Sequence, residues 1–176
     1  MNTVQLTLIL RKDKYTRGVF QGVHPTDKLP TSVSSYPALF IANVDTSDKP
    51  GSHWIAFYFT KDREGEFFDS YGLPPNKYSR TFTNFLNKNS NSWKFNSKTL
   101  QSINSNVCGH YCLYFALFRS RQVSMSTIVN RFSSNKSGND FLVKRFIDKR
   151  FPISLPKYRT EVTKQRAIAQ RNKYTM

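Results

Sequence analysis

The sequence predicts an α+β domain, in which neighbouring strands come first and helices follow. Two segments, 53–60 (HWIAFYFT) and 67–72 (FFDSYG), are rich in aromatic and β-branched residues and flank the turn-forming stretch KDREGE. A third apolar segment, 37–44 (PALFIANV), precedes them as a buried strand. Apolar residues at helical spacing then recur from residue 78 to residue 150. Strands followed by a run of helices are typical of α+β proteins.

The first 36 residues are expected to hold little regular structure. An apolar patch from Val4 to Leu10 fits either a short strand or an early helix. No positive region precedes it and no small-residue cleavage site follows it, so it is not expected to be a secretory signal. The rest of this segment is rich in turn formers, and Pro25 and Pro30 argue against a long helix.

The segments 53–60 and 67–72 are expected to pair as an antiparallel hairpin around a turn at 61–66. In that register the paired residue numbers add to about 126 or 127, so His53 faces the position just beyond the second strand. Further along, 92–101 alternates between polar and apolar residues and is expected to be extended.

Four segments carry apolar residues at helical spacing: 78–90, 107–121, 123–132 and 138–150. Phe82, Phe85 and Leu86 share one face of the first. The second is apolar on most sides, which predicts a central, buried helix. Asn139 or Asp140 is the expected N-cap of the last.

The length of 176 residues suits one domain, which we place at 1–156. Residues 157–176 are polar and basic, and this tail is expected either to belong to the domain or to be flexible. No apolar run approaches the roughly 18 residues that a membrane span needs, so no membrane contact is expected.

The chain is strongly basic. Its 27 Lys and Arg residues against 11 Asp and Glu give a formal net charge of +16. A charge of this size predicts a polyanionic partner, and we expect nucleic acid, bound without sequence preference. The alternative is that the charge serves solubility alone.

The two cysteines, Cys108 and Cys112, lie four residues apart in the predicted helix 107–121. This spacing is poorly placed for a mutual disulfide. With no export signal, it indicates an intracellular, reducing compartment. A zinc site made of these cysteines and His110 lacks a fourth ligand and has unsuitable spacing.

Cys108 is the candidate nucleophile. A thiol in the first turn of a helix faces the positive end of the helix dipole, which lowers its pKa. Gly109 beside it would let a substrate backbone approach closely. The alternative is a structural cysteine that packs as a small hydrophobic residue.

A thiol nucleophile needs a base, and the chain offers three histidines. His24 lies in a loop that contains proline, and His110 is two residues from Cys108, so on a helix it points away from the thiol. His53 opens a buried strand, where a rigid scaffold can present a catalytic group.

Two further polar residues complete the candidate site. Asp69 lies among aromatic residues, where a carboxylate is costly to bury without a partner. It either orients the His53 imidazole, given a shift or bulge in the hairpin, or caps a turn with Ser70. Gln101 precedes Cys108 by seven residues, and its amide could donate to an oxyanion together with the Cys108 backbone N–H.

Three stretches in this order, GSHWIAFYF, GEFFDSYGLPP and LQSINSNVCGHYCLYF, resemble the adenovirus-type cysteine proteases, the adenain family. The resemblance covers about residues 15–120 and is greatest to the branch encoded by adenovirus-like large DNA transposons and their viral relatives. The spacing of histidine, acid, glutamine and cysteine is shared with the wider clan of ubiquitin-like-protein proteases.

The resemblance implies a fold and a set of roles. The fold is a mixed central sheet flanked by helices, with the nucleophile at the N-terminus of a buried central helix. The implied roles are nucleophile for Cys108, general base and acid for His53, imidazole orientation for Asp69, oxyanion donation for Gln101, and shaping of the cleft for Trp54 and Gly109.

The resemblance also implies a function. Family members are thiol endopeptidases that cleave viral precursor polypeptides at small-residue, glycine-containing sites during virion maturation, in the virion and the host nucleus. They need no cofactor for the chemistry and use DNA as a stimulatory cofactor. We expect the chain to act as a monomer.

One departure concerns the activating peptide that some family members hold by a disulfide. The only other cysteine here is Cys112, which is expected to pack in the core, so such a tether is not predicted and a noncovalent peptide stays open. Two other functions also stay open: a protease for ubiquitin-like modifiers, and a basic DNA-binding or packaging protein without turnover.

Overall fold

The computed structural model describes residues 1–152, so the predicted tail at 157–176 and the last residues of the predicted domain 1–156 lie outside the described residues. The described part is built from these elements, in chain order: α1 (Thr3–Lys12), β1 (Phe20–Pro25), η1 (Thr26–Lys28), β2 (Ala38–Asn43), β3 (Trp54–Phe59), β4 (Glu64–Phe68), η2 (Pro75–Lys77), α2 (Arg80–Asn89), β5 (Ser92–Phe95), α3 (Cys108–Arg119), α4 (Met125–Asn130) and α5 (Lys136–Arg150).

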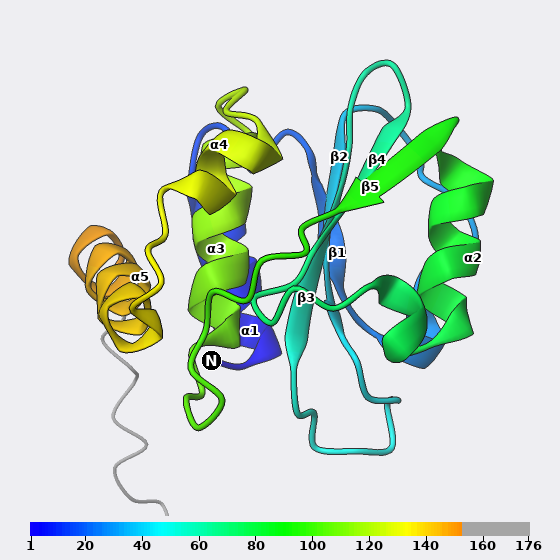
Figure 1. Cartoon of the computed structure of the whole chain (residues 1–176). Helices are drawn as coiled ribbons and strands as arrows, with labels where there is room; N and C mark the ends of the chain where they lie inside the picture. Colours follow the sequence, from blue (N-terminus) through cyan, green and yellow to red (C-terminus); the bar gives the residue numbers. More distant parts are fainter. Residues whose placement is uncertain (153–176) are drawn as a thin grey trace, which may run out of the picture.

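A single mixed sheet forms the middle layer, with its strands in the order β1-β2-β3-β4-β5. The two outer pairs are parallel, and the two inner pairs are antiparallel. Helices α1, α3, α4 and α5 cover one face of the sheet, and α2 covers the other (Figure 1). This arrangement confirms the predicted α+β fold class with a mixed central sheet. Among the described residues, no helix is both long and apolar enough to cross a bilayer.

Alternation along the strands sends successive side chains to opposite faces and creates two cores. On the face toward α1 and α3, Tyr58 and Phe68 pack with the apolar side of α3. Phe115 stacks on Phe68 with ring centroids 4.5 Å apart. On the other face, strand phenylalanines meet the predicted apolar side of α2, formed by Phe82, Phe85 and Leu86. Aromatic packing therefore fixes both helix layers against the sheet.

The central hairpin forms as expected, but its register differs from the prediction. Ala56 pairs with Phe68 and Phe59 with Gly65, so that paired residue numbers add to 124. The turn is tighter than the predicted 61–66 because the Thr60 N–H donates to the Glu64 carbonyl, and β4 already begins at Glu64. This change moves the end of β4 toward His53.

Of the two structures expected for the Val4–Leu10 patch, the helix is confirmed: the patch belongs to α1, whose start is held by a capping box between Asn2 and Gln5. Other expectations about elements need correction. Strand β1 was not predicted, and it pairs in parallel with β2. The segment 92–101 is a strand only to Phe95.

The predicted N-cap of the last helix is also wrong. The side chain of Asn135 caps α5, one turn earlier than expected. Asn139 and Asp140 instead lie within the helix and face the loop before α3. Asn139 Nδ2 donates to the Leu100 carbonyl at 3.1 Å, and Asp140 accepts from the Tyr111 hydroxyl at 2.9 Å. These two side chains serve to hold the loop that carries Gln101.

Candidate active site

Cys108 is the first residue of α3 and is 7% exposed. The helix has no side-chain N-cap, because the residue in the cap position is Val107. First-turn N–H groups are therefore left to other acceptors. The backbone N–H groups of Gly109 and Trp54 lie near the Cys108 sulfur and lower the pKa of its thiol. The fold thus places the thiol where backbone donors favour a thiolate.

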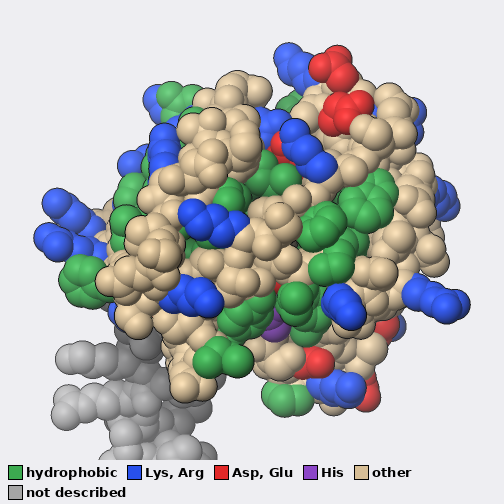
Figure 2. All heavy atoms as spheres, viewed as in Figure 1, with side chains coloured by type: hydrophobic (Ala, Val, Ile, Leu, Met, Phe, Trp, Pro, Cys, Tyr) green, Lys and Arg blue, Asp and Glu red, His purple; other side chains and the backbone are tan. Residues whose placement is uncertain are grey.

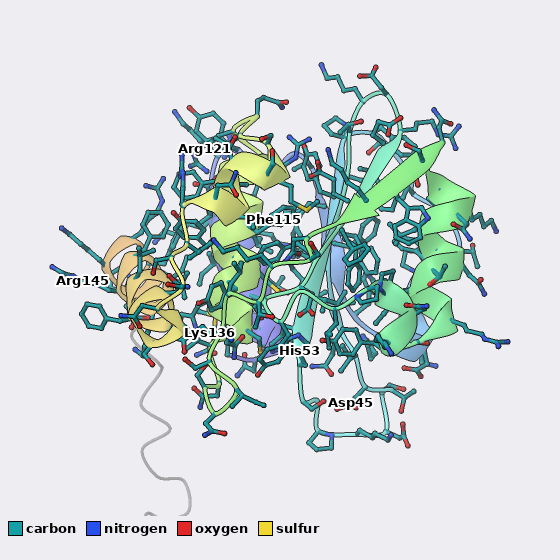
Figure 3. All side chains as sticks on the ribbon, viewed as in Figure 1. Asp45, His53, Phe115, Arg121, Lys136 and Arg145 are labelled. Carbon is teal, nitrogen blue, oxygen red and sulfur yellow. The ribbon has the colours of Figure 1, made fainter. Side chains whose placement is uncertain are left out.

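His53 lies immediately before β3, at the end of the sheet that adjoins the N-terminus of α3 (Figure 3). Its Nε2 lies 2.6 Å from Asp69 Oδ1, and the Cys108 thiol lies beside its ring, close enough for each group to shift the pKa of the other. Because Nε2 faces the carboxylate, Nδ1 is the atom left to face the sulfur. The structure therefore brings Cys108, His53 and Asp69 together in series, although His53 precedes β3, Asp69 follows β4 and Cys108 begins a helix.

The electrostatics of this series favour charge separation. Burial alone would lower the pKa of His53, but the hydrogen bonds to Asp69 and to Cys108 raise it to about 9. Burial alone would raise the pKa of the Cys108 thiol, and the hydrogen bond to His53, together with the imidazolium charge, lowers it below its ordinary value. A thiolate beside an imidazolium is the activated form of a cysteine nucleophile.

Asp69 is fully buried and has both carboxylate oxygens occupied. Oδ1 accepts from His53 and from the Tyr71 N–H, and Oδ2 accepts from the Leu73 N–H and the Tyr78 hydroxyl. The two alternatives for Asp69 are thus both present, since it contacts the imidazole and also caps the turn after β4. The cap holds the carboxylate in place for the ring.

Sequence reasoning missed the tyrosines that enclose the imidazole. Tyr71 stacks on His53 with ring centroids 4.8 Å apart, and Tyr78 lies 5.6 Å away on a tilted plane. Burial, together with the nearby Asp69 charge, raises the pKa of the Tyr78 phenol, so its hydroxyl stays a proton donor. Tyr71 stands two residues after Asp69 in the FFDSYG stretch, which was the available signal.

Asn96 is a second residue that was not predicted. It accepts from the Asp69 N–H at 2.9 Å and donates to the Asp69 carbonyl at 2.7 Å. This pair of bonds fixes the backbone of Asp69 to the segment after β5. Nothing in the sequence around Asn96 distinguishes it from the other asparagines of this polar region.

Gln101 is 1% exposed and is held at both ends of its amide. Its Oε1 accepts from the Ser70 hydroxyl at 2.7 Å, and its Nε2 donates to the Ser105 carbonyl at 2.8 Å. The other Nε2 proton faces the Tyr71 hydroxyl across a longer 3.4 Å contact. The amide is thereby anchored beside the ring that stacks on His53.

Trp54 and Gly109 lie next to each other at the mouth of the site. Trp54 Nε1 donates to the Met1 carbonyl at 3.1 Å. A Cβ at Gly109 would lie 3.0 Å from Met1 Cβ and 3.4 Å from Trp54 Cδ1, so a side chain there would be crowded. Trp54 and Met1 also line a cavity of about 290 Å³ bordered by the loop between β2 and β3. In Figure 2 a histidine lies recessed among hydrophobic side chains, at the place where Figure 3 labels His53.

The other candidate residues are not brought into the site. His24 lies on β1 with its ring centroid 6.1 Å from that of Phe40. His110 points toward Asp148 of α5, with 3.7 Å between Nε2 and Oδ1. Cys112 is fully buried one turn after Cys108, and this burial raises its pKa well above the ordinary value. Within residues 1–152, no three His, Cys, Asp or Glu side chains gather so as to hold a metal ion.

No family model matches the sequence, and no curated protein matches it. Similar solved structures include the following three. The central domain of an uncharacterized Legionella pneumophila protein, Lpg1148, has a TM-score of 0.50 and 12% identity, over 85% of this chain and 96% of that domain. ChlaDub1 of Chlamydia trachomatis has a TM-score of 0.46 and 14% identity, over 83% of this chain and 74% of its own. The ASFV pS273R protease has a TM-score of 0.39 and 22% identity, over 60% of this chain and 43% of its own.

The present chain thus matches less than half the length of the ASFV protease. All three identities are low, so these likenesses concern the fold. The Legionella domain shares the α+β arrangement over most of both chains. The site itself supplies the chemistry. A thiol, an imidazole and a carboxylate lie in series at the N-terminus of a buried helix, an arrangement that can activate the thiol as a nucleophile.

Proposed function

We propose that this protein is a thiol endopeptidase that cleaves viral precursor polypeptides. The observation that carries the proposal is the series Asp69–His53–Cys108, with the 2.6 Å bond from carboxylate to ring and the thiol beside the ring. Each member is buried, so water does not screen the interactions between them.

In the first half of the reaction, the Cys108 thiolate attacks the carbonyl carbon of the scissile peptide bond. The bond between sulfur and carbon forms as the carbonyl π electrons move to oxygen, giving a tetrahedral oxyanion. When the intermediate collapses, the C–N bond breaks and protonated His53 gives its proton to the leaving amine. The product is a thioester on Cys108. Water then attacks the thioester with His53 as general base, which releases the acid and restores the thiol.

The oxyanion would be held by the Gln101 amide and the backbone N–H of Cys108. Gln101 is preorganised for this role because Ser70 and Ser105 fix its amide plane. Its long contact to Tyr71 is the one that an oxyanion would replace. Loss of one such donor typically costs about 3 kcal/mol, so Gln101→Ala should lower kcat about a hundredfold.

Glycine-containing cleavage sites are the substrates we favour. Trp54 and Met1 crowd the space around Gly109, beside the sulfur, which supports selection of residues with little or no side chain. The assignment to viral precursors and virion maturation, with action as a monomer in the virion and the host nucleus, rests on the three sequence stretches that resemble the adenain family.

DNA is the cofactor we propose, as an activator that concentrates enzyme and substrate. The formal charge of +16 supports this, and Figure 2 shows Lys and Arg side chains spread over the visible face with few Asp and Glu among them. Binding would release counterions from the phosphates, so stimulation should fall steeply as salt rises. An activating peptide would have to be noncovalent, because the Cys112 sulfur is buried.

The test uses a glycine-containing precursor peptide, a ubiquitin-like conjugate, and a thiol-directed vinyl sulfone. Wild-type protein should cleave the peptide and label at Cys108, and Cys108→Ala should do neither, whereas Cys112→Ala should retain both. Cleavage of the conjugate alone would assign the enzyme to ubiquitin-like modifiers. If the protein bound DNA but was neither labelled nor able to cleave either substrate, the enzyme proposal would be wrong and a DNA-packaging protein would be favoured.

The cofactor is tested separately. Turnover is measured with and without duplex DNA over a series of salt concentrations, with Cys108→Ala as the blank. DNA should raise kcat/KM at low salt and lose its effect as salt increases. Equal turnover with and without DNA at low salt would remove the cofactor while leaving the peptidase intact.

A further inference from the structure

A second polar cavity, of about 410 Å³, lies at the end of α3 opposite to Cys108. Its wall includes Tyr58 of β3, Glu66 of β4, Lys94 of β5, Arg119 at the end of α3, and Gln122 just beyond. The cavity therefore lies where the C-terminal end of the nucleophile helix meets three neighbouring strands. Its volume falls within the range of sites that bind small ligands.

Arg119 is a buried cation with an incomplete set of partners. Its side chain is 10% exposed, its Nε donates to Glu66 Oε2 at 2.7 Å, and its guanidinium carbon lies 4.4 Å from the centre of the Tyr58 ring. An arginine has five N–H donors. Within residues 1–152 the two terminal nitrogens of Arg119 have no hydrogen-bond acceptor, and the residue lines the cavity. The pair of terminal nitrogens is the group that binds planar anions bidentately.

The charges around the cavity favour a singly charged ligand. The charged residues on its wall are Lys61, Lys94, Arg119, Asp62, Glu64 and Glu66. A phosphate carries close to two negative charges at neutral pH and would face three carboxylates. A carboxylate carries one charge, fits the planar guanidinium, and can also meet Lys94, which lies 3.6 Å from Glu66 and is 66% exposed at its side chain.

Gln122 adds a polar side chain to the wall, and its backbone conformation costs conformational free energy. Its φ is +64°, a left-handed conformation that favours glycine, yet the position holds a glutamine whose side chain lies beside Tyr58 on the cavity wall. The side chain thus completes the polar wall beside Arg119. A glycine at this position would suit the backbone and would remove only the side chain.

We propose that this cavity binds a carboxylate, held bidentately by the terminal nitrogens of Arg119 and approached by Lys94. The carboxylate comes from a peptide, either as its C-terminus or as an acidic side chain. Binding at this cavity does not require the chemistry at Cys108, so its test is independent of the peptidase proposal.

The experiment follows the Arg119 Nε–H signal by NMR in the full chain during titration with three peptides and inorganic phosphate. The peptides are N-acetyl-triglycine as the free acid, the same peptide as the amide, and N-acetyl-Gly-Glu-Gly amide. A saturable shift with the free acid alone assigns the ligand to a C-terminus, and a shift with the glutamate peptide assigns it to an acidic side chain. The triglycine amide should give none.

Variants test the geometry. Arg119→Lys keeps the charge but loses the paired nitrogens, so affinity, followed in every variant by the backbone N–H signal of residue 119, should fall at least tenfold. Gln122→Gly and Lys94→Ala do not remove the buried ion pair, and each should weaken binding about threefold, as followed by the same signal. Lys88→Ala, an exposed lysine on α2, is the charge-matched control and should change nothing. No shift with either carboxylate, an equal shift with the triglycine amide, or tighter binding of phosphate would overturn the proposal.

Discussion

Replacing Asp69 by asparagine removes the charge that holds His53 protonated, and the effect can be sized from the structure. The pKa of His53 rises from 6.5 to about 9 in the fold. At about 1.4 kcal/mol per pKa unit, this corresponds to roughly 3 kcal/mol in favour of the imidazolium. Asp69 and Cys108 supply it together, and a hydrogen bond to a charged group accounts for about 1.5–3 kcal/mol.

Asp69→Asn should therefore move the pH at which Cys108 ionises upward by about one to two units. Loss of the imidazolium also removes the main cause of the lowered thiol pKa. At pH 6, the rate of alkylation by iodoacetamide should fall about tenfold to a hundredfold, since the thiolate is the reactive form. The assay is a pH series of alkylation rates, with the modified cysteine identified by mass spectrometry.

Tyr78→Phe is the matched control, because it removes one hydrogen bond to the same carboxylate and leaves the charge. It should shift the alkylation profile by less than Asp69→Asn does. Near-ultraviolet circular dichroism checks that the turn after β4 stays folded. Superimposable profiles for wild type and a folded Asp69→Asn variant would refute the reasoning that a carboxylate–imidazole–thiol series ionises the sulfur.

Three other results are expected. Phe57→Ala, a fully buried core change, should lower the free energy of unfolding by about 3–5 kcal/mol in urea titrations, whereas Val4→Ala, 64% exposed, should stay within about 0.5 kcal/mol; equal losses would contradict the two-core description. Burial alone would raise the pKa of Asp13, but the hydrogen bonds from Arg121 and from the Tyr15 and Thr16 backbone N–H groups together lower it, so the carboxylate stabilises the fold above its ordinary pKa of 3.8 and loses that effect as the pH falls through the lowered value. Asp13→Asn should thus cost about 2 kcal/mol at pH 7 and progressively less as the pH falls below 3.8, and a loss independent of pH would be inconsistent with the ion pair. Labelling of the folded protein at pH 7 should stop at one thiol per chain and be unchanged in Cys112→Ala; a second thiol reacting as fast would mean that Cys112 is accessible.

Much of the fold could be predicted because local pattern and tertiary environment agree. The apolar face of α2 and the largely apolar α3 are strong periodic signals, and both lie where their patterns require. Strand β1 was missed because its residues are only partly buried, and its sequence FQGVHP carries glycine and proline that favour turns. The register of the hairpin was misjudged because Glu64 and Glu66 look like turn residues. Glu66 is in fact buried in β4 against Arg119, a partner 53 residues away.

The residues of the candidate site were likewise predictable only in part. Cys108, His53, Asp69 and Gln101 could be proposed because their residue types and order carry chemical meaning. Tyr71, Tyr78 and Asn96 could not, because their roles depend on the loop geometry after β4 and β5 rather than on any local pattern. The role of a residue that positions another residue can be assigned only from the folded structure.

The thiol and its base belong to different layers of the molecule, since Cys108 comes from α3 while His53 and Asp69 come from the sheet. The gap between sulfur and nitrogen is thus governed by how the helix rests on the strands, where Phe115 lies flat on Phe68. Substitutions at Phe68 or Phe115 would impair turnover before they unfolded the protein. The tolerance of these two rings to substitution should consequently be narrower than that of equally buried rings beneath α2.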